Sequence, residues 1–193
     1  GHDWIQTASG IAFYPLRPRV EDVRIEDIAH ALARLPRFVG HTRGAPYSVA
    51  QHSVHVSEEL EPAYAEWSQV AFSPLVSCRQ MALIGLLHDA SEFALCDLPR
   101  PLKRQPELAA YCLAERRMQA CIYEAFGLDS GMEPDLLKQI DRRMLRTEQR
   151  DLMPPERPGE GRDDVPPFTW TVTPWPWHEA ERRFLERFAE LRG

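Results

Sequence analysis

The 193 residues are 44% apolar and 27% charged, which is typical of one globular domain rather than of a disordered or fibrous chain. The formal net charge of -6 argues against a nucleic-acid-binding surface, because such surfaces depend on clustered cations. No apolar run reaches the length of a membrane span and no secretory signal is visible, so we expect a cytoplasmic protein without a membrane partner.

The N-terminal part of the chain predicts a hairpin followed by a helix. Residues 4–16 alternate apolar and polar side chains around residues 8–10, which indicates a short hairpin or an extended arm. Apolar residues then recur at helical spacing up to a stop at Pro36, and these are Ile25, Ile28, Leu32 and Leu35.

A second helix is predicted to begin at Ser48, whose side chain can cap it. Within it, His52 shares one face with Val49 and Val56 and therefore points inward. The helix either breaks near Pro62 or runs on irregularly to residue 70.

A third helix is predicted from Pro74 to about Phe93, with Ser73 as its cap. It contains an apolar run that should lie in the core. Four polar residues follow at or beyond the end of that run, namely His88, Asp89, Glu92 and Asp97.

The second half of the chain predicts further helices separated by proline-rich segments. Residues 98–106 read as a largely irregular, basic connection, and a helix follows from about 107 to 126. The next helix, from about 134 to 152, has an inward face made of Leu137, Asp141, Met144, Leu145 and Glu148. Residues 153–167 are a proline-rich loop, and residues 168–193 hold several tryptophans and a last helix. We expect one all-α domain over residues 1–193.

Polar residues on three predicted helices point toward the same core, and these are His52, His88, Asp89 and Asp141. An unpaired charge in a core costs several kcal/mol or more, and a metal ion is one compensation. Taken singly, each residue has a structural explanation, such as an arginine partner for Asp141 from Arg37 or Arg142. Together they favour a site for one divalent ion, and the mixed nitrogen and oxygen donors suit Mn, Fe, Co, Ni or Zn better than Mg.

Three segments carry a resemblance to a known family: VAQHSVHVS, LLHDASEFALCDLPRPLK and the later helix with Asp141. They resemble the HD-domain metal-dependent phosphohydrolases, which take their name from an adjacent His-Asp pair. The pattern HDxSE with a downstream Asp is similar to small bacterial 5'-deoxynucleotidases and to phage-type HD enzymes that hydrolyse deoxynucleoside triphosphates. The resemblance covers about residues 25–152. It implies an HD-type helical bundle with the metal ligands His52, His88, Asp89 and Asp141.

The same resemblance implies roles around the metal. Arg37 would face the substrate phosphate, and Glu92 and Asp97 match acids that flank the reaction centre. Phe38 occupies a position where these nucleotidases place a bulky aromatic residue beside the sugar, and the change of aromatic leaves sugar selectivity open. Independently of the resemblance, the positive charges of Lys103 and its neighbour Arg104 would attract the phosphate tail, and the alternative is that they lie in a solvated loop.

We therefore expect a metal-dependent phosphohydrolase that acts on a deoxynucleoside mono- or triphosphate. The alternative is a helical binding module that holds a structural ion or a regulatory nucleotide without turnover. Glu92 favours the enzyme, because a structural site needs no acid beyond its ligands. Base preference, the physiological ion and the number of subunits stay open, and a homo-oligomer is compatible with the sequence. For the tryptophan-rich part we expect packing within the monomer rather than a subunit contact.

Overall fold

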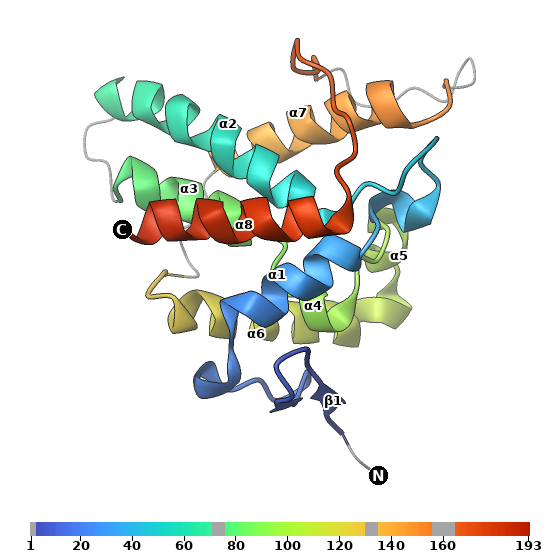
Figure 1. The fold of residues 1–193 in the computed structure, drawn as a ribbon, viewed down its shortest axis with the longest axis vertical. Coiled ribbons are helices and arrows are strands. Elements are labelled where there is room, and N and C mark those ends of the chain that lie inside the picture. Colours follow the sequence, from blue (N-terminus) through green and yellow to red (C-terminus); the bar gives the residue numbers. More distant parts are fainter. Residues whose placement is uncertain (1–2, 71–75, 130–134, 156–164) are drawn as a thin grey trace.

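The computed structural model describes residues 3–70, 76–129, 135–155 and 165–193, and over these ranges the chain is mostly helical with a small N-terminal hairpin (Figure 1). The α-helices are α1 Ile25–Arg34, α2 Val49–Val70, α3 Cys78–Leu87, α4 Glu92–Leu95, α5 Arg100–Lys103, α6 Ala109–Ala125, α7 Asp135–Leu152 and α8 Trp177–Arg192. Short 3-10 helices lie at Val20–Asp22, Arg37–Gly40 and Pro106–Leu108. No described helix is both long enough and apolar enough to cross a membrane.

The predicted hairpin is present and is fixed to the first helix. Strands β1 Ile5–Gln6 and β2 Ala12–Phe13 pair antiparallel, so that Ile5 faces Phe13 across the ladder. The connecting turn is anchored to α1, because the backbone N–H and the hydroxyl of Ser9 both donate to the Asp27 carboxylate, at 2.7 and 2.6 Å. These two bonds satisfy a carboxylate that is only 2% exposed.

Helix α2 is the central element of the bundle. It packs against α1, α3, α7 and α8, and α8 runs across α1 and α3 (Figure 1). Gly85 lets α3 approach α2 closely, since a Cβ at this position would lie 3.0 Å from a side-chain carbon of Leu60 and 3.3 Å from Ser57 Cα. This approach brings the end of α3 beside the middle of α2. The helix continues through Pro62 to Val70, so of the two predicted alternatives the break near Pro62 is wrong.

The third helix differs from its prediction at both ends. It begins at Cys78, where Ser77 caps it through a reciprocal pair of bonds with Gln80. The predicted start is wrong because residues 76–77 are not helical, whereas Ser73 and Pro74 lie outside the described residues. The predicted continuous run to Phe93 is also wrong, because the helix ends at Leu87 and residues 88–91 form a turn before α4.

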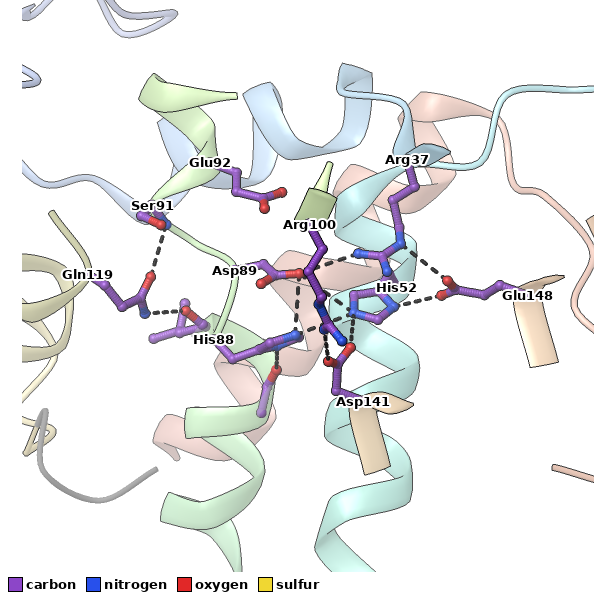
Figure 2. A network of polar contacts seen from close by, with 12 residues as sticks. Arg37, His52, His88, Asp89, Ser91, Glu92, Arg100, Gln119, Asp141 and Glu148 are labelled. Atoms are coloured by element: carbon purple, nitrogen blue, oxygen red, sulfur yellow. Dashed lines mark hydrogen bonds and ion pairs between the residues drawn. The ribbon is translucent and has the colours of Figure 1, made fainter. Parts of the chain in front are cut away.

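A side chain from α6 explains why the chain can break there. Gln119 donates to the Leu87 carbonyl at 2.6 Å and accepts from the Ser91 amide at 3.0 Å. Backbone groups at the interruption of a helix need such partners. The break turns the side chains of His88 and Asp89 toward His52 on α2 and Asp141 on α7 (Figure 2).

The remaining predicted elements are present with shifted bounds. The connection at 98–106 is more regular than predicted, because Pro99 and Pro101 fit the start of the short helix α5. Helix α6 is slightly shorter than predicted, and α7 reaches residue 152 as predicted. The predicted last helix is α8, and Ala180, Phe184 and Leu191 on it lie in the core. Of the proline-rich segment 153–167, residues 156–164 lie outside the described part.

Candidate metal centre and substrate pocket

The candidate site lies where α2, the turn after α3 and α7 meet (Figure 2). Helix α2 supplies His52, and the turn supplies His88 and Asp89. One potential ligand atom from each of these residues lies within 4.8 Å of the other two, so the group can hold a metal ion. Asp141 faces them from α7.

The two imidazole rings are oriented by hydrogen bonds through their Nδ1 atoms. His52 Nδ1 lies 2.6 Å from a Glu148 carboxylate oxygen, and His88 Nδ1 lies 2.7 Å from the Gly85 carbonyl. Both partners are acceptors, which places the ring hydrogen on Nδ1 and the lone pair on Nε2. The two Nε2 atoms are 3.3 Å apart. Two lone pairs at this distance repel unless a cation or a proton lies between them.

Two carboxylates converge on the same Nε2 atoms. Asp89 Oδ2 lies 3.3 Å from His88 Nε2 and 3.6 Å from His52 Nε2, and Asp141 Oδ1 lies 3.4 Å from His52 Nε2. A set of two imidazole nitrogens and two carboxylate oxygens suits a divalent first-row transition metal. The residues present therefore fit such an ion, and Glu148 and the Gly85 carbonyl supply the outer hydrogen bonds that oriented ligands need.

Charges within the cluster shift the pKa values of its members. Burial by itself would lower the pKa of His88, but the carboxylates of Asp89 and Asp141 outweigh it and raise the pKa to about 9. Burial would raise the pKa of Asp89, but His88, His52 and Arg37 outweigh it and hold this pKa far below its usual range. Without an ion, the cluster therefore retains a proton on imidazole at neutral pH. Metal binding would have to release that proton.

Glu148 is a residue whose role the sequence did not assign. It is fully buried, and its carboxylate contacts both His52 Nδ1 and Arg37 Nε, the latter at 3.2 Å. Burial would raise its pKa, but Arg37 and His52 outweigh this and lower it, so the group is ionised. A signal was available, because Glu148 follows Asp141 by two helical turns and shares its face of α7.

A pocket of about 540 Å³ opens beside the cluster. Arg37 lines it and is held by Glu148 and by Asp89 Oδ2, the latter 3.3 Å from Arg37 NH1. Other predicted site residues on its wall are Phe38, Asp89, Glu92, Asp97, Lys103 and Asp141, whereas His52 and His88 do not line it. His41 also lines this pocket. Phe38 and Val39 have positive φ values of 55° and 54°. This conformation is uncommon for bulky and for β-branched residues and is often found at ligand sites.

Glu92 is the most unusual acid of the pocket. It is 4% exposed, and its Oε2 atom has no hydrogen-bond partner among the described residues. Burial, together with the charges of Asp89 and Asp97, raises its pKa to about 9, so the carboxyl is protonated at neutral pH. The nearest cation is Lys103, whose Nζ lies 3.6 Å from Glu92 Oε1 and is itself bound to Glu115 at 2.6 Å.

Comparison with other proteins gives the ancestry of this chain. No family model matches it. The chain is 38% identical to the uncharacterized protein YfdR of Escherichia coli (strain K12) over 149 residues, which cover 77% of this chain and 72% of YfdR. It is 34% identical to the uncharacterized protein RCAP_rcc00048 of Rhodobacter capsulatus over 138 residues, which cover 71% of this chain and 65% of that protein. The chain belongs to the YfdR family. The names of these relatives state no activity, so the function of this YfdR-family member is argued from its site.

In this YfdR-family chain the arginine partner of Asp141 differs from the two that the sequence suggested. The partner is Arg100, whose NH2 atom lies 3.6 Å from Asp141 Oδ2, whereas Arg37 binds Glu148 and Asp89, and Arg142 is exposed. The contact was not predictable from spacing, because it joins α5 to α7 across the pocket. The proline-flanked basic motif around Arg100 was its only signal.

Proposed function

We propose that this member of the YfdR family is a metal-dependent phosphohydrolase of the HD-domain type that cleaves a 5'-phosphate ester of a deoxynucleotide. The observation that carries this proposal is the convergence of two imidazole Nε2 atoms, 3.3 Å apart, with carboxylates at the edge of a pocket that also holds an arginine. A deoxynucleotide offers both a phosphate for the charged end of such a pocket and a sugar and base for its apolar wall.

The ion would be held by His52, His88, Asp89 and Asp141. When bound, a divalent ion lowers the pKa of a coordinated water from about 15.7 towards about 7 and withdraws charge from a phosphoryl oxygen. The remaining groups of the pocket then have to bind the phosphate, position the substrate and supply a proton.

Arg37 is placed to bind the phosphate. Its guanidinium lines the pocket, and its Nε and NH1 atoms are fixed by Glu148 and Asp89. An arginine has five N–H donors, so donors are left for phosphate oxygens after these two contacts. The side chain is pre-organised, because it is only 11% exposed and bonded on two sides.

Glu92 is placed to act as the general acid. Its raised pKa keeps the carboxyl protonated at neutral pH, and the proton can pass to the oxygen that leaves as the phosphate ester breaks. Asp97 lines the same pocket and competes for this role, but Glu92 is the better candidate because it is buried and its Oε2 has no described hydrogen-bond partner. Phe38, Val39 and Leu98 form an apolar wall suited to sugar and base.

The test is product release by chelated protein supplied with Mn²⁺, Co²⁺ or Mg²⁺ and a panel of deoxynucleoside mono- and triphosphates. We expect ion-dependent release of phosphate or triphosphate, and loss of that release in Asp141→Ala. Asp135→Ala is the matched control, because this residue begins the same helix but its side chain is 91% exposed. Absence of release from every substrate with every ion would contradict the proposal, and tight nucleotide binding without turnover would indicate a binding module instead.

A further inference from the structure

Arg100 stands between the candidate metal cluster and the pocket. It is the first residue of α5, and the prolines on either side of it, Pro99 and Pro101, restrict the local backbone. Its side chain is 51% exposed and lines the pocket. Its guanidinium points toward Asp141 (Figure 2). The guanidinium is therefore accessible to a ligand, and the backbone that carries it is restricted.

The cations of the pocket differ in how firmly they are held. Arg37 is bonded to Glu148 and Asp89, and Lys103 is bonded to Glu115 and lies near Glu92. Arg100 has one ion pair among the described residues, with Asp141 Oδ2 at 3.6 Å, which is longer than a hydrogen bond. Of these cations, Arg100 is the one that a ligand can engage with the least competition from protein acids.

The partner of Arg100 is also one of the proposed metal ligands. Asp141 presents Oδ1 to His52 Nε2 at 3.4 Å and Oδ2 to Arg100. A divalent ion at the cluster would draw the charge of this carboxylate toward itself and repel the guanidinium. Metal and Arg100 therefore compete for Asp141, and metal binding weakens the one ion pair that holds Arg100.

We propose that Arg100 is a further phosphate-binding residue whose availability is set by the metal. In the metal-free protein it pairs with Asp141, and in the metal-loaded protein it binds an oxygen of the substrate phosphate. This inference rests on the proposed function, because it takes Asp141 as a metal ligand and a phosphate ester as the substrate.

The proposal predicts that removing the charge of Arg100 affects the binding of the two ligands differently. The ion should bind equally well or more tightly, because a competing cation has been removed from Asp141. Phosphate should bind more weakly, but only when the ion is present. If Arg100 only supported the fold, its replacement would lower the affinities for the ion and for phosphate together, whether or not the other ligand is bound.

The experiment uses calorimetry with Mn²⁺ and inorganic orthophosphate as probes on protein from which metal has been removed by chelation. Arg100→Gln is compared with wild type and with Arg117→Gln, since Arg117 lies on α6, is exposed and is not among the described residues that line the pocket. For Arg100→Gln we expect Mn²⁺ affinity unchanged or up to about fivefold higher, an increase kept small by solvent screening of the half-exposed pair. We expect orthophosphate affinity about tenfold lower with Mn²⁺ bound and unchanged without it. Arg117→Gln should match wild type.

The remaining outcomes overturn the proposal. A fall in Mn²⁺ affinity would assign Arg100 a structural role, and an equal loss of phosphate affinity with and without Mn²⁺ would remove the link to the metal. An unchanged phosphate affinity would show that Arg100 does not bind phosphate. Failure of the proposed function is recognised separately, as wild-type protein that shows the expected binding and releases no product from any deoxynucleotide.

Discussion

Two histidines on α2, His52 and His55, lie three residues apart and belong to different regions of the molecule. His52 is fully buried, and both of its ring nitrogens face charged or polar groups of the cluster. His55 lies between the rings of Trp170 and Trp175, with ring centroids at 5.0 and 4.8 Å. Two histidines on one helix thus have different surroundings, polar for His52 and largely aromatic for His55, because different elements pack against them.

The region around His55 ties the C-terminal segment to α2. The Gln51 side chain donates to the Thr173 carbonyl and accepts from the Trp175 amide, both at 2.8 Å. Trp170 Nε1 donates to Glu59 at 2.7 Å. Trp170 and Trp175 therefore pack within the monomer, as expected, while Trp177 is 51% exposed and lies under Arg34. This region stabilises the fold. The His52 region instead brings together the carboxylates of Asp89, Asp141 and Glu148, whose negative charge requires cations or protons nearby.

The largest effect should come from Asp89→Ala. This change removes a proposed ligand and a partner of Arg37 together, so metal binding and phosphohydrolysis should both be lost. We expect metal affinity to fall by more than about 100-fold, since even outer-shell partners of ligands contribute about 10- to 100-fold. Metal content after dialysis and product release measure the two losses, and full activity in this variant would remove Asp89 from the centre.

Glu92→Gln should separate chemistry from metal binding. Glutamine keeps the shape of the side chain but cannot donate the carboxyl proton, so the rate should fall by about 10²- to 10⁴-fold. Metal affinity should stay within a few fold of wild type, because Glu92 is not a proposed ligand. An active Glu92→Gln protein would transfer the acid role to Asp97.

A pair of glutamate variants compares the two histidine regions directly. Glu148 contacts His52 Nδ1 at 2.6 Å, and Glu58 contacts His55 Nδ1 at 3.3 Å. Glu148→Gln should lower metal affinity by about 10- to 100-fold, because it weakens the bond that orients a ligand. Glu58→Gln should leave metal affinity unchanged. Equal affinities in a metal titration of the two variants would contradict the positioning role of Glu148.

The smallest effect is a pH dependence of stability in the metal-free protein. The folded pKa of Glu92 is raised from 4.5 to about 9, so folding takes up a proton and the free energy of unfolding falls as pH rises through this window. His88 acts in the same direction above its ordinary pKa of 6.5. Glu92→Gln should therefore reduce the fall in the free energy of unfolding between pH 4.5 and 6.5, where one group contributes at most about 1.4 kcal/mol per pH unit. Denaturant unfolding of chelated protein across this pH range measures this free energy. The same slope with pH in wild type and Glu92→Gln would show that Glu92 titrates normally.

Local periodicity was sufficient to predict much of the helical fold, because the apolar face of a helix is formed by residues three or four positions apart in the sequence. The hairpin and the inward position of His52 followed from such patterns. The break after Leu87 did not, since residues 88–91 contain no glycine or proline and the backbone groups of Leu87 and Ser91 are satisfied by Gln119 from a distant helix. Glu148 and Arg100 were missed as site residues because their partners lie on other elements, although Glu148 shares a face of α7 with Asp141.

The most direct test of the metal centre is a Mn²⁺ titration of chelated wild type, His52→Gln and His55→Gln, with bound ion measured at equilibrium. Wild type and His55→Gln should bind one ion per chain with the same affinity, while His52→Gln should bind it more than about 100-fold more weakly. Equal binding by His52→Gln and wild type would contradict a metal centre at His52.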